Sequence, residues 1–143
     1  MAFTLISSAM FTVSFKKTDS PFGKDLGTRK QMMGEDFVAN ALGNATGFTL
    51  PMQHYITRNA WGAVRQRPGL DLKTRSLIAV AMLTALGKQH EIRGQVRGAL
   101  SNGATAQEIP EVLLRARIYC GIPSAAEAFR SAAEVVDGAK HPA

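Results

Sequence analysis

Residues 71–86, DLKTRSLIAVAMLTAL, contain the most apolar run of the chain and decide the fold class. Asp71 is expected to cap a helix here, because its carboxylate can accept the free amides of the first turn and complements the helix dipole. Every residue from Leu77 to Leu83 is apolar, so this helix has no polar face. In a globular chain such a helix is buried on every side, in part by another subunit. The stretch predicts the central helix of an all-α protein.

Helical spacing continues on both sides of this central helix, and residues that start or end helices separate the segments. About six helices joined by short connections predict an all-α helical bundle. Pro110 is expected to distort its helix, because it falls one position beyond the amides that lack partners. The separating residues are Gly43-Asn44, Pro51, the break RPGLD, Asn102-Gly103, the capping box Thr105-Ala-Gln-Glu108, Gly121 and Pro123.

Apolar residues at spacings of three or four define the expected core of the last three helices. Each group falls on one face of its helix, which is the face expected to be buried. They are Ile92, Val96, Ala99 and Leu100, then Ile109, Val112, Leu113, Ala116 and Ile118 or Tyr119, then Ala126, Phe129, Ala133 and Val136.

The domain boundaries follow from the same patterns. Residues 1–23 are expected to form an extension, since TVSF alternates like a short strand and DSPFG has the composition of a turn. The helical domain is expected to cover residues 24–138, and residues 139–143 form a tail. No apolar run approaches the roughly 20 residues needed to span a bilayer.

Composition and charge exclude several classes of protein. With 143 residues, 45% of them hydrophobic and 20% charged, the chain is typical of one globular domain rather than a disordered or fibrous protein. The net charge of +6 favours anionic partners, but the basic residues are dispersed and few aromatic residues accompany them, which argues against nucleic acid. Cys120 is the only cysteine, so a disulfide within the chain is excluded and a reducing cytoplasm fits best.

The stretch GKQHEIRGQVRGALSNGAT, residues 87–105, carries a cluster of ionisable residues. On a helical wheel His90, Arg93 and Arg97 share one flank of the apolar stripe, while Glu91 lies one turn before Gln95 on the other. Long basic side chains can simply line the rim of a buried face and reach water. Alternatively, the flank faces a site enclosed by protein, where histidine exchanges a proton and an arginine fork holds a carboxylate.

Three longer segments carry a family resemblance: AWGAVRQRPGLDLKTRSLIAVAMLTALGKQHEIR, ALSNGATAQEIPEVLL and YCGIPSAAEAF. Together they resemble the carboxymuconolactone decarboxylase family, and specifically its gamma-carboxymuconolactone decarboxylase branch, from about Met33 to Val136. The resemblance implies an alkylhydroperoxidase-like all-α subunit without cofactor or metal, assembled into a homo-oligomer, a trimer or a hexamer. It also implies decarboxylation of a carboxylated unsaturated lactone in the protocatechuate branch of aromatic catabolism.

Such a reaction needs little from the enzyme, because the electron pair left by carbon dioxide can delocalise into the lactone carbonyl. The protein has only to stabilise an enolate and deliver a proton. In that scheme Arg93 or Arg97 anchors a carboxylate, and His90 or Glu91 handles the proton.

Several polar positions depart from the family pattern. The related disulfide reductases carry Cys-x-x-Cys-x-x-x-His where this chain has Lys88, Glu91 and Gln95, so their redox chemistry is excluded. Decarboxylase sequences, like the reductases, have a histidine at the position of Gln95, and glutamine cannot transfer a proton. They usually have a second histidine at the position of Arg115. His54, where acidic residues are common, is a candidate replacement donor. The expected substrate-binding residues are therefore Arg93, Arg97, Gln95, Arg115 and His54.

The sequence predicts a cytoplasmic carbon–carbon lyase that acts on a small organic anion, with no nucleic-acid or membrane partner. The alternatives are a diverged family member that binds or transforms another small anion, and an oligomeric subunit without turnover. A basic nucleic-acid-binding module ranks last. The lyase interpretation requires that the polar flank of helix 87–105 faces a dry, positively charged site.

Overall fold

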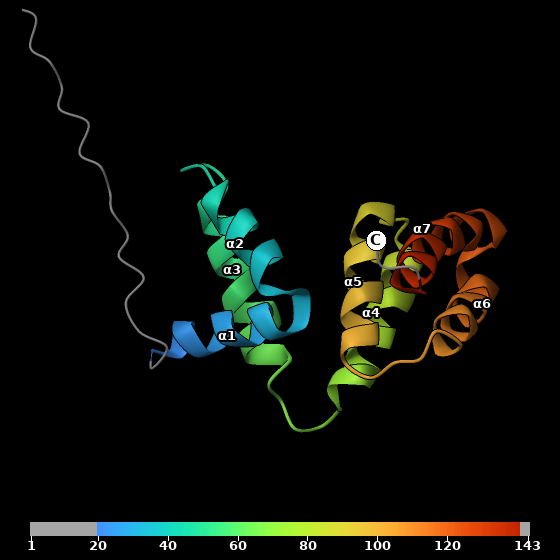
Figure 1. Cartoon of the computed structure of the whole chain (residues 1–143), viewed down its shortest axis with the longest axis horizontal. Coiled ribbons are helices and arrows are strands. Elements are labelled where there is room, and N and C mark those ends of the chain that lie inside the picture. The colour runs from blue at the N-terminus through green and yellow to red at the C-terminus, as the bar shows by residue number, and fades with distance from the viewer. Residues whose placement is uncertain (1–19, 141–143) are drawn as a thin grey trace, which may run out of the picture.

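The computed structural model describes residues 20–140, which form seven α-helices and one π-helix without a strand. Figure 1 shows α4 to α7 gathered in one bundle, with α1 to α3 grouped beside it. The predicted all-α class is confirmed. The elements are α1 (Pro21–Met33), α2 (Glu35–Gly43), α3 (Leu50–Ile56), η1 (Thr57–Val64), α4 (Leu72–Ala85), α5 (Gln89–Ser101), α6 (Glu108–Cys120) and α7 (Ile122–Lys140).

Local capping signals fix the helix boundaries around the central pair. An Asp71 carboxylate oxygen accepts the amide of Thr74 at 2.8 Å, which makes Asp71 the predicted cap of α4. The capping box is complete, because Glu108 N donates to the Thr105 hydroxyl at 3.2 Å and Thr105 N donates to the Glu108 carboxylate at 2.8 Å. Gly103 has φ of 91°, the left-handed conformation that ends α5 without strain.

Two prolines occupy helix positions that differ from those expected. Pro21 begins α1 and Ser20 caps it by accepting the amide of Gly23 at 3.0 Å, so SPFG, residues 20–23, starts a helix instead of forming a turn. Pro110 is the third residue of α6, whose cap is Gln107. An amide at that position has no partner within its helix, so the predicted distortion is wrong.

The core lies between α4, α5, α6 and α7. The predicted row on α5 is confirmed, since Ile92, Val96 and Ala99 are completely buried against residues such as Val80 and Leu113. On α7 the prediction is confirmed in part: Phe129 and Val136 are partly buried and pack against the core, whereas Ala133 is exposed. The buried alanines are Ala125, Ala128 and Ala132.

Part of the apolar surface of α4 and α6 remains open in the single chain. Either Ile118 or Tyr119 was predicted to join the core, but they are 67% and 75% exposed, so this prediction is wrong. On the central helix α4, Ile78 and Met82 are also exposed. The chain by itself therefore buries α4 on only part of its circumference.

Helix α1 approaches α5 closely at two glycines. A Cβ atom at Gly98 would lie 3.3 Å from the Met32 carbonyl oxygen, and one at Gly94 would lie 3.2 Å from Met33 Cε. Both distances are shorter than ordinary van der Waals contact, so the absence of side chains at these positions lets α1 lie against α5. Within residues 20–140, no helix has both the length and the hydropathy needed to cross a membrane.

Candidate functional site

Gln95 joins helix α5 to η1 through Arg65. The Arg65 guanidinium donates from Nη2 to Gln95 Oε1 at 3.1 Å. Its carbon Cζ lies 4.5 Å from the ring centroid of Trp61, one helical turn earlier in η1. The indole ring is 5% exposed, so the guanidinium rests on a buried aromatic face. Of the residues selected from the sequence, Gln95 alone belongs to this arrangement.

Ser76 and Asn102 complete what we call the Arg65 network, which consists of Arg65, Trp61, Ser76, Gln95 and Asn102. Arg65 Nη1 donates to the Ser76 hydroxyl at 3.3 Å, and Asn102 Nδ2 donates to the same oxygen at 2.9 Å. Ser76 is completely buried in α4, and Asn102 follows the end of α5. Three segments of the chain thus meet at one guanidinium group.

Among residues 20–140, no carboxylate forms an ion pair with Arg65. Burial lowers the pKa of Arg65, and the neighbouring Arg75 lowers this pKa further. Arginine nevertheless remains protonated in proteins. In the described part of the chain, its side-chain hydrogen bonds go to a hydroxyl and an amide, and the ion pairs are formed by other residues. A half-buried cation with neutral partners can bind an anion.

Arg93 and Arg97 lie on the opposite flank of α5, beside α7. They border a groove of about 540 Å³ together with Glu134 of α7. Arg93 holds Glu134 with two hydrogen bonds, including one from Nη2 to Oε1 at 3.0 Å, and this pairing raises the pKa of Arg93. Arg97 is exposed. The carboxylate of Glu134 already occupies the fork that was predicted to hold a substrate carboxylate.

His90 and Glu91 lie in the first turn of α5, and both are exposed. Glu91 is one helical turn before Gln95, on the flank that faces Arg65. His90 belongs to the flank of Arg93. The two predicted proton-transfer residues therefore lie on different sides of the helix.

Arg115 and His54 contact residues that do not belong to the Arg65 network. Arg115 donates to the Tyr119 hydroxyl at 3.2 Å and borders a groove of about 370 Å³ between α4 and α6. His54 is half-buried in α3, and its ring contacts that of Phe22 in α1 edge to face, with centroids 5.2 Å apart. The predicted site residues are thus distributed over several surfaces of one chain.

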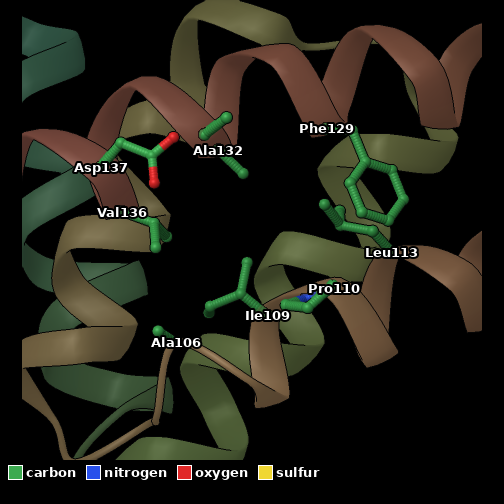
Figure 2. A pocket seen from close by; sticks show the side chains of 9 residues that line it. Ala106, Ile109, Pro110, Leu113, Phe129, Ala132, Val136 and Asp137 are labelled. Atoms are coloured by element: carbon green, nitrogen blue, oxygen red, sulfur yellow. The ribbon is translucent and has the colours of Figure 1, made fainter.

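An apolar cavity of about 170 Å³ lies between α6 and α7 and is shown in Figure 2. Ile109, Pro110 and Leu113 line it from α6, while Phe129 and Val136 line it from α7. The charged residue at this cavity is Asp137, whose carboxylate disfavours an anion. The cavity therefore lacks the charge that a carboxylate ligand requires.

A metal centre has no visible basis in the described part of the chain. No group of three or more histidine, cysteine, aspartate or glutamate side chains within residues 20–140 is arranged to hold an ion. Within the same residues, Arg65 is a half-buried cation whose hydrogen-bond partners are neutral.

The sequence analysis missed Arg65, Ser76 and Asn102. Arg65 follows Trp61 by four residues, the spacing at which helical side chains meet, and this was the available signal. Ser76 is a polar residue at the start of the most apolar helix, and Asn102 was interpreted only as a helix stop. Their connection depends on contacts across 11 to 30 residues of sequence.

Comparison with known proteins gives a consistent assignment. Residues 51–134 match the model of the carboxymuconolactone decarboxylase family. The chain is 47% identical over 108 residues to the nitrosuccinic acid decarboxylase of Metarhizium robertsii, covering 76% of each chain. It is 39% identical over 114 residues to the 4-carboxymuconolactone decarboxylase of Acinetobacter baylyi, covering 80% of this chain and 85% of that protein. This protein is a decarboxylase and belongs to the carboxymuconolactone decarboxylase family.

Proposed function

We propose that the enzyme decarboxylates a small organic dianion whose departing carboxylate lies beside an electron-accepting group. In 4-carboxymuconolactone that group is the lactone carbonyl, and in nitrosuccinate it is the nitro group. The bond between carbon and the carboxylate breaks, carbon dioxide leaves, and the electron pair forms an enolate or a nitronate. A proton then adds to carbon, so the reaction needs no oxidant or reductant.

Arg65 is suited to stabilise the electron-accepting group. During the reaction, negative charge moves from the departing carboxylate to the oxygens of that group. A fixed cation held against the departing carboxylate would stabilise the substrate more than the transition state. The same cation beside the accepting oxygens favours the transition state, and partial burial strengthens the interaction.

The single observation that carries this proposal is the half-buried Arg65 guanidinium with neutral partners. We assign it the anion contact in place of Arg93, whose charge Glu134 already neutralises. Arg97 is available in the groove beside α7, on the other flank of the helix. Glu91 and His90 remain the candidates for proton delivery, with Glu91 on the flank of Gln95.

Two substrates deserve direct comparison. The carboxylated lactone is the substrate expected from the sequence, and the relative from Acinetobacter baylyi, 39% identical, supports it. Nitrosuccinate is supported by the relative from Metarhizium robertsii, which is 47% identical. A nitronate is a weaker base than most enolates, so it is stable enough to leave the site and take its proton from water, without a donor on the enzyme. This fits a chain that has Gln95 where family members usually have histidine.

We further propose that the enzyme works as a homo-oligomer, a trimer or a hexamer, in a reducing cytoplasm. The apolar face of α4 and α6 supports assembly, since Ile78, Met82, Ile118 and Tyr119 are all exposed in the single chain. The lone cysteine, Cys120, is compatible with a reducing compartment.

The test of this function is a steady-state assay of carbon dioxide release with each dianion. We expect turnover of at least one of them, and we expect Arg65→Met to lower kcat about a hundredfold or more, as loss of an oxyanion donor does in other enzymes. Arg117→Met is the matched control, because Arg117 is an exposed arginine on α6. Unchanged kcat in Arg65→Met, with the protein still folded, contradicts the role of Arg65.

A further inference from the structure

The side chain of Asn102 is directed away from its own helix end. As the residue after α5, Asn102 has φ of −91°, and the left-handed position that ends the helix belongs to Gly103. Asparagine is therefore not required there by backbone conformation. Its amide Nδ2 instead donates to the hydroxyl of Ser76 on the neighbouring helix, at 2.9 Å.

Ser76 uses all of its hydrogen-bonding capacity. Its hydroxyl donates to the Leu72 carbonyl at 3.0 Å and accepts from Asn102 and Arg65 at 2.9 and 3.3 Å. A hydroxyl has one proton and two lone pairs, so no position is left over. Because the proton is directed to Leu72, both lone pairs are available to the two donors. The orientation of the hydroxyl therefore favours one position of the Arg65 guanidinium.

In the described part of the chain, the groups that hold the Arg65 side chain are neutral. Ser76 and Gln95 accept from its two terminal nitrogens, and the indole ring of Trp61 lies against its plane. A carboxylate at either position would hold the guanidinium as well, but it would also neutralise the charge. Neutral acceptors fix the geometry and leave the charge available for a ligand.

We propose that Asn102, through Ser76, and Gln95 are positioning residues that fix the Arg65 guanidinium without neutralising it, and so make the site specific for an anion. This inference rests on the proposed role of Arg65 in decarboxylation. It adds Ser76 and Asn102 to the machinery of the reaction and explains why a completely buried serine occurs in the apolar helix α4.

The first test compares Ser76→Thr with Ser76→Val, two variants of nearly equal shape that differ in the hydroxyl. Both place the same extra bulk in the core, so their difference isolates the hydroxyl and its hydrogen bonds to Leu72, Asn102 and Arg65. We expect Ser76→Thr to exceed Ser76→Val in kcat by about threefold to tenfold, which corresponds to one net hydrogen bond. If the added bulk prevents folding, Asn102→Ala provides the test instead, because Asn102 is only half-buried and donates to the Ser76 hydroxyl. We expect its kcat to fall in the same range.

The second test compares Gln95→Glu with Gln95→Met. The glutamate keeps an acceptor for Arg65 but adds a negative charge, whereas methionine keeps the length and removes the acceptor. We expect Gln95→Glu to raise the Kd for succinate, used as an unreactive dianion, about tenfold or more above that of Gln95→Met at neutral pH. A merely structural role for Gln95 predicts the reverse order, because the conservative glutamate would preserve the contact.

The outcomes separate this inference from the proposed function. If Arg65→Met lowers kcat while the two Ser76 variants match each other and the two Gln95 variants bind succinate equally, the positioning inference is overturned and the role of Arg65 stands. If Arg65→Met itself leaves kcat and succinate binding unchanged, both fail. Differences in the expected directions support both.

Discussion

At the scale of single residues, two arginines of this enzyme differ in their surroundings. Arg93 is bound to Glu134, so its positive charge is matched by a neighbouring negative one. Arg65 lies against Trp61 and bonds to a hydroxyl and an amide, so its charge remains unmatched among the described residues. The surroundings of Arg65 favour an anionic ligand, whereas the ion pair of Arg93 links α5 to α7.

Glu91 and His90 allow a prediction about the proton. Glu91 lies on the flank of Gln95, whereas His90 lies on the flank of Arg93, so we expect Glu91→Gln to lower kcat about a hundredfold and His90→Asn to have a smaller effect. The measurement is carbon dioxide release under saturating substrate, with circular dichroism to verify folding. Wild-type rates in both variants would mean that neither side chain transfers the proton, contrary to the assignment.

The sequence allowed part of this site to be predicted. Gln95 stood out because the family resemblance places a histidine at its position, and it does take part in the Arg65 network. Arg65 did not stand out, because arginines are common on exposed helix faces and its burial depends on α4 and α5. Pairings between distant residues, such as Ser76 with Asn102, need the packed structure.

At the scale of helices, boundaries were predictable where the signal is local. The Asp71 cap and the Thr105–Glu108 capping box involve residues only three positions apart, so their sequence patterns determine them. The π-helix η1 was not predicted, because its hydrogen-bonding pattern has no equally local signature. On α7 the larger residues of the predicted row, Phe129 and Val136, pack against the core, but the buried alanines were not identified because alanines occur on several faces of the helix.

Adjacent leucines of α6 give a prediction about stability. Leu113 is completely buried among α4, α5 and α7 residues, whereas its neighbour Leu114 is 41% exposed. We expect Leu113→Ala to lower the free energy of unfolding by about 2–5 kcal/mol, because it removes buried contacts and leaves a cavity. Urea denaturation measures this change, and Leu114→Ala is the matched control. Equal effects of the two variants would contradict the assigned orientation of α6.

At the scale of the whole molecule, the exposed apolar face is the main feature that a single chain leaves unexplained. Ile118 and Tyr119 are exposed on α6, and Ile78 and Met82 are exposed on α4, which packs against α6. The sequence could predict that these residues are apolar, but it could not say whether the same chain or another copy covers them. An all-apolar helix is compatible with either answer.

Assembly through this face has a measurable consequence. We expect sedimentation velocity to give a mass of three or six chains for the wild type, and Ile118→Asp to shift the distribution toward smaller species. A charge at that position would have to be desolvated in the interface. Arg117→Asp is a neighbouring exposed control. A wild-type protein that is monomeric at micromolar concentration would contradict the proposed assembly.

The role of Arg65 is tested most directly by a crystal structure with 3-nitropropanoate, the product that decarboxylation of nitrosuccinate would give. We predict that the nitro oxygens lie within about 3.2 Å of the Arg65 guanidinium nitrogens. Gln95 and Ser76 should still accept hydrogen bonds from the same guanidinium group. A ligand bound instead beside Arg93 and Arg97, with Arg65 making no contact to it, would contradict the proposal.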